Sequence, residues 1–219
     1  MNYKCPKCRL VNFPNAPVCG RCGTTLSELR PEIAEPTRQK PSRFLARAFV
    51  CAAVSVSILF GFYLSLIASA KSLTIDEKYT VRRAIALLRE KGFEDEAMLL
   101  DNFTAFRGTD NWLNASVAKE NAYAATNFPF EIMTLYPDFF TYPVDDTERA
   151  AVLLHESKHL AGKNEAEAFE FVWKNRKQLG WTKDKYSSSP VWQNVRRQTS
   201  DNAPGLFVCD KNDFGDCTE

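Results

Sequence analysis

Histidine is scarce in this sequence, and an excess of charge of either sign is lacking. The 219 residues include two histidines, and the formal net charge is +1. That balance gives no reason to expect a nucleic-acid partner. No internal repeat or low-complexity tract is visible, and the length allows one domain of ordinary size with small additions.

Cysteine is unevenly distributed, with four of the seven cysteines close to the N-terminus. These four have the spacing C-x2-C-x10-C-x2-C, which is typical of a structural tetrahedral Zn²⁺ site. A segment of about 25 residues cannot bury a core of its own, so the metal has to supply its fold. We therefore predict a small zinc finger over residues 1–25, with the ligands Cys5, Cys8, Cys19 and Cys22.

The finger resembles two known kinds of zinc module equally well, the RanBP2-type finger and the bacterial zinc ribbon. Asn12 stands where the RanBP2 family has its asparagine, whereas Tyr3 replaces the usual tryptophan. Members of that family bind single-stranded RNA or ubiquitin. The residues that make those contacts are missing here, so the resemblance implies a protein-interaction or purely structural module.

Residues 48–70 form an uncharged apolar run with the length of a membrane span. At about 1.5 Å per residue they would make a helix of roughly 35 Å, and hydrocarbon is about 30 Å thick. A buried core helix is the alternative. Ala68-Ser69-Ala70 also resembles a signal-peptidase site, but the run is too long for a signal core. We predict a transmembrane helix over residues 48–70, joined to the finger by a Pro-containing linker over residues 26–47.

Residues 71–219 are long enough for a packed core and predict a mainly α domain of the α+β class. Residues 126–142 are aromatic and β-branched, and Pro129 favours an edge strand or irregular extended segment there. Capping signals and a later glycine predict three helices. They are Thr74 with Glu77 before Gly92, Asp145 with Glu148 before Gly162, and Asn164 with Glu167 before Gly180.

The two histidines of the chain stand together in the pattern HExxH. On a helix His155 and His159 share one face, where both imidazoles can ligate one Zn²⁺ at about 2.0–2.1 Å. Glu156 can then take the proton of a zinc-bound water. A chance match on an amphipathic helix is the alternative. The apolar residues 150–154 before the motif and the scarcity of histidine favour a metal site.

This pattern resembles the zincin metallopeptidases. From His155 to Glu165 the residues read H-E-x-x-H-x-x-G-x-x-E, similar to the metzincin spacing, with Gly162 at the glycine. Metzincins usually have His or Asp at the last position and a Met-turn downstream, whereas here every methionine precedes the motif. The resemblance implies a zincin-like fold with an edge strand that binds the substrate backbone, a role that residues 128–136 could serve.

A zinc ion that catalyses hydrolysis needs a third protein ligand, and three glutamates follow the motif. We favour Glu165, because Gly162 lets the chain fold back toward the zinc. Glu167 and Glu170 remain alternatives, although Glu167 also fits a helix-capping role. In related enzymes a tyrosine or histidine stabilises the oxyanion, and Tyr186 is a candidate for that role. The alternative, which we favour, is that Tyr186 and the tryptophans near it pack in the core around the helix.

These patterns predict a membrane-anchored zinc metallopeptidase with one catalytic and one structural Zn²⁺. Glu156 would activate a zinc-bound water for attack on a peptide carbonyl in a peptide or protein substrate. The alternative is a non-catalytic membrane adaptor, whose finger binds a protein partner and whose HExxH helix is only structural. A carboxylate that converges on the histidines at an open site would favour the enzyme. A packed apolar wall at the same place would favour the adaptor.

The cysteines also predict the topology in the lipid bilayer, because the basic residues on the two sides of the apolar run are nearly balanced. The finger binds zinc through thiolates, which suits a reducing cytoplasm. Cys209 and Cys217 lie in a tail whose turns could bring them to disulfide distance, which suits an oxidising compartment; two free thiols are the alternative. We predict a cytoplasmic finger and a periplasmic or extracellular C-terminal domain.

Overall fold

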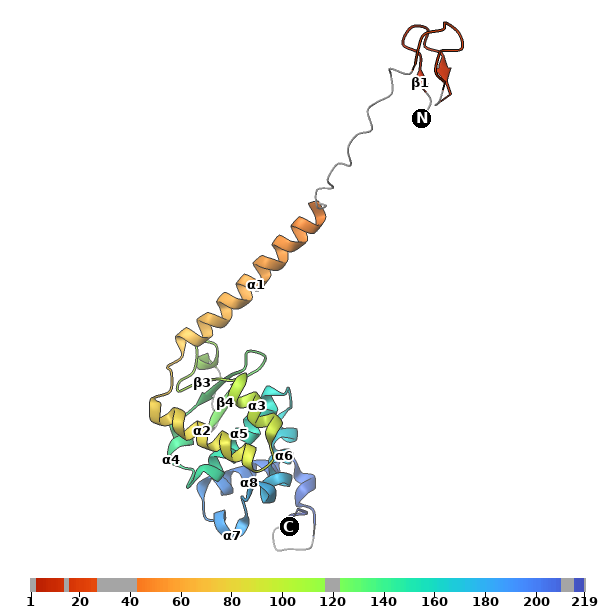
Figure 1. Cartoon of the computed structure of the whole chain (residues 1–219). Helices are drawn as coiled ribbons and strands as arrows, with labels where there is room; N and C mark the ends of the chain where they lie inside the picture. The colour runs from red at the N-terminus through yellow and green to blue at the C-terminus, as the bar shows by residue number, and fades with distance from the viewer. Residues whose placement is uncertain (1–2, 14–15, 27–42, 117–122, 210–214, 219) are drawn as a thin grey trace. The chain divides into compact units, whose positions relative to one another are not determined.

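The computed structural model describes residues 3–13, 16–26, 43–116, 123–209 and 215–218. It divides into an N-terminal unit, residues 1–54, and a C-terminal unit, residues 55–219. Figure 1 shows the helices and strands along the chain. Most of the linker predicted over residues 26–47 lies outside the described residues.

The N-terminal unit contains a short antiparallel ribbon next to the cysteines. β1 (Tyr3–Lys4) pairs with β2 (Val11–Asn12), and Val18 forms a bridge with Thr25. The buried apolar cluster of this unit consists of Cys5, Cys19 and Leu26. So small a cluster cannot hold a fold alone, in agreement with a fold that depends on metal.

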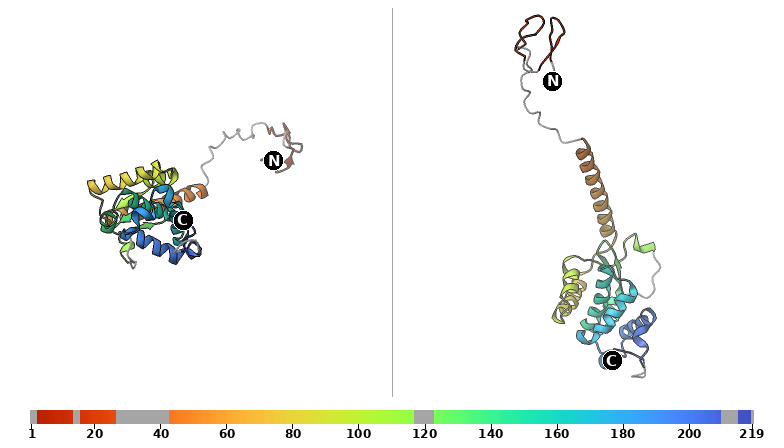
Figure 2. Two further views of the ribbon diagram at one scale, coloured as in Figure 1. Left: turned by 90° about the horizontal axis from the view of Figure 1, so that it is seen from below. Right: turned by 90° about the vertical axis from the view of Figure 1, so that its right-hand side faces the viewer.

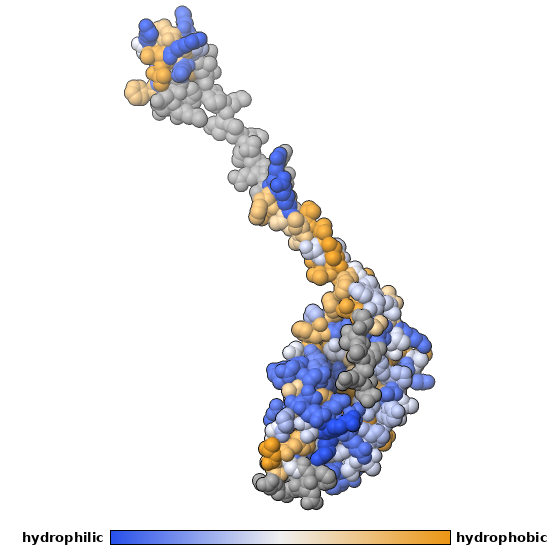
Figure 3. All heavy atoms as spheres, turned by 180° about the vertical axis from the view of Figure 1, so that it is seen from behind, coloured by the Kyte–Doolittle hydropathy of each residue, from blue (hydrophilic) through white to orange (hydrophobic). Residues whose placement is uncertain are grey.

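The apolar run forms one long helix, α1 (Arg43–Ser69). It begins before the run predicted over residues 48–70, because Arg43–Arg47 continue the same helix. Its large apolar side chains between Phe44 and Leu64 are mostly exposed, and Figure 3 shows them in orange along the helix. By length and composition α1 could cross a membrane.

The C-terminal unit is mainly helical, with one small mixed sheet. Its helices are α2 (Ile75–Glu90), α3 (Glu94–Asn102), α4 (Pro137–Thr141), α5 (Asp146–Leu160), α6 (Glu165–Leu179), α7 (Lys183–Tyr186) and α8 (Pro190–Asn202), with 3-10 turns at Asn114–Ser116 and Pro204–Phe207. α5 packs among α2, α3, α6 and the sheet (Figure 2). Ala150, Leu153 and Leu154 on it are therefore fully buried.

The sheet has three strands in the order β3 (Ala105–Arg107), β5 (Ile132–Leu135), β4 (Ala124–Asn127). β5 runs parallel to β3 and antiparallel to β4. The prediction of an edge strand within residues 128–136 is therefore wrong, because β5 is the central strand and all its residues are buried. Pro129 lies in the turn after β4, where its missing N–H removes no ladder hydrogen bond. The edge strand that contacts α5 is β4.

Capping residues and glycines set the helix ends as the sequence predicts, with one exception. Capping boxes form at Thr74 with Glu77 and at Asn164 with Glu167. Asp145 caps α5 without help from Glu148, which points inward and is fully buried. The Glu148 carboxylate instead accepts hydrogen bonds from the Val144 N–H, the Trp181 indole and the Ser189 hydroxyl.

The C-terminal tail is closed into a loop by a disulfide and is held against α6 by a buried ion pair. Cys209 and Cys217 form a disulfide with a Cα–Cα distance of 5.1 Å. Next to it, the buried Asp216 carboxylate accepts hydrogen bonds of 3.0 Å from the Trp173 indole and from the Arg176 guanidinium. Both partners lie on α6, so the tail braces the helix that begins at Glu165.

Candidate metal centre

The two histidines of the motif lie one turn apart on the last turns of α5. Their rings are 4.8 Å apart between centroids, and the two Nε2 atoms are 3.1 Å apart. The i, i+4 spacing puts both imidazoles on one face of the helix. Both side chains are partly accessible, with exposed fractions of 13% for His155 and 19% for His159.

Gly162 ends α5 and turns the chain back toward the histidines. Its φ of 75° is the left-handed conformation that glycine adopts without a steric penalty. The Gly162 and Lys163 N–H groups donate to the carbonyls of His159 and Lys158, which closes the helix end. After this turn α6 begins at Glu165, next to the imidazoles.

Glu165 is the one of the three candidate glutamates that reaches both histidines. Its Oε2 is 3.3 Å from the His155 Nε2, and its Oε1 is 3.4 Å from the His159 Nε2. The other two have other partners: Glu167 serves the capping box and pairs with Lys163, and Glu170 pairs with Lys174.

The two imidazoles and the Glu165 carboxylate lie close to the separations that a tetrahedral zinc ion requires. Zinc bonds of about 2.0–2.1 Å at tetrahedral angles put neighbouring ligand atoms about 3.3–3.4 Å apart. The two Nε2 atoms are 3.1 Å apart, and the Glu165 carboxylate lies 3.3 Å from the His155 Nε2 through one oxygen and 3.4 Å from the His159 Nε2 through the other. The residues therefore fit a zinc ion with three protein ligands.

Two further contacts orient the imidazoles. The His159 Nδ1 lies 2.9 Å from the Lys163 carbonyl oxygen, so it donates there and leaves Nε2 free for a metal. The His155 ring packs against Phe169, with centroids 4.2 Å apart. Its Nδ1 is buried and has no hydrogen-bond partner among the described residues.

The electrostatics of the cluster favour a cation between the three side chains. Burial lowers the pKa of His159, but its hydrogen bonds with Glu165 and the Lys163 carbonyl outweigh burial and raise that pKa to about 9. Hydrogen bonds from His155 and His159 lower the pKa of Glu165 well below its usual value. Glu165 is thus a carboxylate at neutral pH, and a bound metal would replace the proton on His159.

Glu156 lies beside this cluster, in the wall of a cleft of about 400 Å³. Its carboxylate is largely buried, and its Oε2 accepts a 2.7 Å hydrogen bond from the Thr126 hydroxyl of β4. The cleft lies between β4, α5, α6 and α8, and it is lined among others by Tyr123, Ala124, His155, Glu156, Glu165, Phe169, Gln198, Asp201 and Asn202. An open cleft, and not a packed apolar wall, therefore adjoins the histidines.

Sequence reasoning missed the parts of this cleft that carry no motif. Thr126, Phe169 and the polar side of α8 come from three separate segments, and no spacing links them to the HExxH helix. The candidate oxyanion stabiliser Tyr186 is wrong, because it is buried at the other end of α5. There its hydroxyl donates to the Asp145 carboxylate over 2.7 Å.

Among the described residues, no strand pairs with the outer edge of β4. The Tyr136 N–H donates to the Tyr123 carbonyl, so these two residues form a hydrogen-bonded pair. Along the two strands, hydrogen-bonded and non-hydrogen-bonded residue pairs then alternate. In that alternation Ala125 and Asn127 face β5, whereas the N–H and C=O groups of Ala124 and Thr126 face away from it. An extended peptide could therefore pair with β4.

The four N-terminal cysteines form a second group that could hold a metal ion. Cys5 Sγ lies 3.5 Å from Cys22 Sγ, Cys8 Sγ lies 3.4 Å from Cys19 Sγ, and all four sulfurs lie within 4.8 Å of one another. Backbone hydrogen bonds from Arg21 and Cys22 lower the pKa of Cys19 to about 6, which favours the thiolate that binds zinc.

No family model, curated protein or solved structure matches this chain. The likeness to zincins therefore rests on residues 155–165 and on their geometry.

Proposed function

We propose that the chain is a membrane-anchored zinc metallopeptidase, with His155, His159 and Glu165 as ligands of the catalytic zinc and Glu156 as the general base. The observation that supports this most is the convergence of two Nε2 atoms, 3.1 Å apart, with the Glu165 carboxylate, one oxygen of which lies 3.3 Å from His155 and the other 3.4 Å from His159. The open cleft beside it favours an enzyme over an adaptor with a purely structural helix.

The roles of the protein groups follow from their contacts. When bound, zinc would supply the acidity that lets water react at neutral pH. Glu156 would take the proton from the attacking water and pass it to the leaving amine. Thr126 donates to one carboxylate oxygen of Glu156, so it holds the carboxylate in place and leaves the other oxygen for the proton.

The proposed substrate is an extended peptide segment lying along β4. The outward backbone groups of Ala124 and Thr126 would bind its main chain, as in β-strand addition. Thr126 also contacts Glu156, which places this edge next to the general base. The polar side chains Gln198, Asp201 and Asn202 of α8 line the same cleft and would contact the substrate.

On this proposal the N-terminal cysteines hold a structural zinc and α1 anchors the chain. The sulfur separations fit zinc–sulfur bonds of about 2.3 Å, which put neighbouring sulfurs about 3.8 Å apart. The disulfide between Cys209 and Cys217 supports an oxidising compartment for the C-terminal unit. We therefore place the finger in the cytoplasm, where it could bind a protein partner, and the peptidase in the periplasm or outside the cell.

The direct test combines zinc analysis with cleavage of a peptide library by the full chain in detergent. We expect zinc in both groups of ligands. His155→Ala should lose the distal zinc and all cleavage, whereas Cys8→Ser should lower the zinc content and leave cleavage intact. Absence of cleavage by a chain that carries zinc at both sites contradicts the peptidase.

Topology is tested by a thiol reagent that does not cross membranes. In intact cells Cys209 and Cys217 should react only after reduction, and the finger cysteines only after the membrane is opened. Reaction of the finger cysteines in intact cells would reverse the topology.

A further inference from the structure

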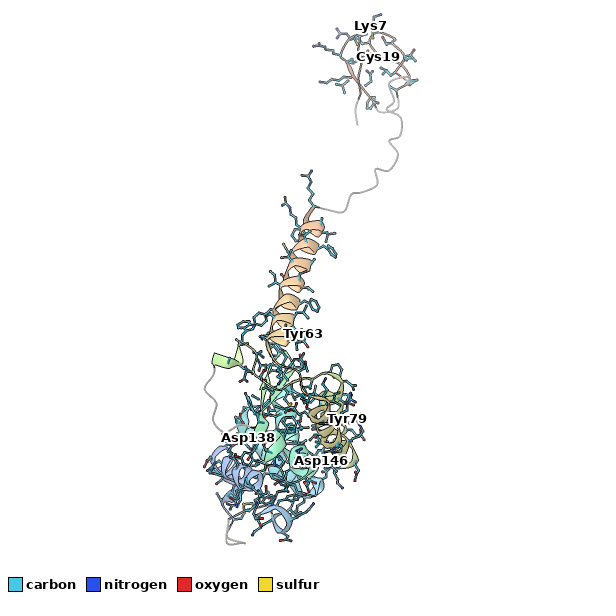
Figure 4. The ribbon with its side chains drawn as sticks, turned by 90° about the vertical axis from the view of Figure 1, so that its left-hand side faces the viewer. Lys7, Cys19, Tyr63, Tyr79, Asp138 and Asp146 are labelled. Carbon is cyan, nitrogen blue, oxygen red and sulfur yellow. A yellow bond between two sulfur atoms is a disulfide. The ribbon has the colours of Figure 1, made fainter. Side chains whose placement is uncertain are left out.

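The junction between α1 and the rest of the C-terminal unit lies inside the apolar part of α1. The Phe62 ring contacts Trp112 with a centroid separation of 5.5 Å and Phe130 with one of 5.3 Å. The Trp112 indole N–H donates to the Ser65 hydroxyl, and its backbone N–H donates to the Ser69 hydroxyl. Tyr63 also lies on this segment of α1 (Figure 4).

The position of Phe62 along α1 determines how deep this junction would lie in a membrane. A hydrocarbon layer of about 30 Å needs about 20 residues of helix. Residues 48–61 supply only about 21 Å before Phe62 is reached. If α1 spans the bilayer as proposed above, Phe62 lies within about 9 Å of the edge of the hydrocarbon, so Trp112 and Phe130, which contact it, lie just below the lipid headgroups.

Other exposed aromatic side chains gather at the same end of the sheet. Phe128 and Phe130 belong to the turn between β4 and β5, and Phe103 precedes β3, whose Ala105 N–H donates to the Glu131 carbonyl of that turn. The exposed fractions are 61% for Phe103, 50% for Trp112 and 60% for Phe128. We call these residues, together with Phe130, the aromatic end.

We propose that the aromatic end docks on the bilayer interface at the point where α1 leaves the membrane. Aromatic side chains favour the headgroup region, where apolar rings are buried and the indole N–H is still satisfied. A lipid surface is favoured over a protein partner, because the aromatic end is continuous with the segment of α1 that the membrane would cover. The inference rests on the proposed anchor function of α1.

Trp112 gives a direct probe of this contact. The chain has four tryptophans, and Trp173, Trp181 and Trp192 are buried in a mutual cluster. The full chain is reconstituted into phosphatidylcholine vesicles that contain lipids brominated either near the headgroup or deep in the acyl chain. We expect shallow bromine to quench up to roughly a quarter of the emission, deep bromine to quench less, and Trp112→Phe to abolish the quenching.

Two further variants separate docking of the whole end from an isolated contact of Trp112. Phe128→Trp should add a second quenched emission. Tyr142→Trp is the matched control, because Tyr142 is about half exposed but follows α4, beyond the opposite end of β5 from Phe130. Its added emission should not be quenched. Equal quenching at positions 128 and 142, or none at Trp112, overturns the docking.

Extraction of the vesicles at alkaline pH tests separately whether α1 anchors the chain in the lipid. A chain that stays with the lipid but shows no quenching refutes docking alone. A chain that alkaline buffer releases refutes the membrane span, and docking with it.

Discussion

The choice among Glu165, Glu167 and Glu170 gives the sharpest test of the distal site. Glu165→Ala removes the carboxylate that lies 3.3 and 3.4 Å from the two imidazoles. Zinc sites with four protein ligands have apparent binding free energies of about 10–16 kcal/mol, or roughly 2.5–4 kcal/mol per ligand. Loss of one ligand should therefore weaken zinc binding by about 10²–10³-fold.

Glu167→Ala is the matched control, because it changes the same helix turn without touching the cluster. Glu167 closes the capping box with Asn164 and pairs with Lys163. Its loss should cost about 1 kcal/mol of stability and leave zinc affinity almost unchanged. Glu170→Ala should also leave zinc affinity almost unchanged, and it should cost less stability, because it removes an exposed ion pair with Lys174.

The assay is competition with a chromophoric zinc chelator, with thermal unfolding measured in parallel. Both are carried out on the full chain with the finger zinc already bound. The reasoning is refuted if Glu165→Ala keeps the affinity of the unmodified chain, or if Glu167→Ala or Glu170→Ala loses zinc instead.

Three further predictions concern the base, the turn and the tail. Glu156→Gln should keep the distal zinc but lose cleavage in the peptide-library assay, because an amide cannot take the proton; full activity would remove the peptidase. Gly162→Ala should cost about 1 kcal/mol of stability and weaken zinc binding, because the positive φ of Gly162 sets the position of α6. Gly180→Ala is the control, since Gly180 has a similar φ of 80° and open space around it. It should cost the same stability and leave zinc affinity unchanged. Burial raises the pKa of Asp216, but hydrogen bonds from Thr218 and the charge of Arg176 outweigh it and lower the pKa. The ionised Asp216 carboxylate therefore stabilises the fold above about pH 4, and this stabilisation is lost as the pH falls through the lowered pKa of Asp216. Asp216→Asn should lower the melting temperature at pH 7, where it removes the buried negative charge beside Arg176, and should have less effect at pH 3. An equal effect at both pH values would contradict the linkage.

The sequence predicts those parts of the structure that depend on local rules. Capping residues and glycines give the ends of α2, α5 and α6, and the i, i+4 spacing gives the shared face of the histidines. The preference for Glu165 follows from Gly162 in the same way, because a left-handed residue after the helix reverses the chain within a few residues.

The parts that the sequence could not supply depend on contacts between distant segments. Pro129 indicates an edge strand only if it stands inside a strand; in the structure it occupies a turn, and the strand after it is the buried centre of the sheet. Glu148 matches a capping pattern, yet burial beside Trp181 and Ser189 gives it other partners. Nothing local distinguishes these outcomes.

The turn between β4 and β5 connects the proposed chemistry to the proposed membrane contact. Thr126, just before it, orients Glu156, and the Phe128 ring lies near Gly162 at the end of the motif helix. Phe130, at its other side, packs on Phe62 of α1. The metal cluster thus lies at the end of the unit that α1 enters, so a peptide segment tethered to the same bilayer would reach the cleft at a high effective concentration. That proximity would let a short edge strand select substrates mainly by their position at the membrane, with little need for deep side-chain pockets.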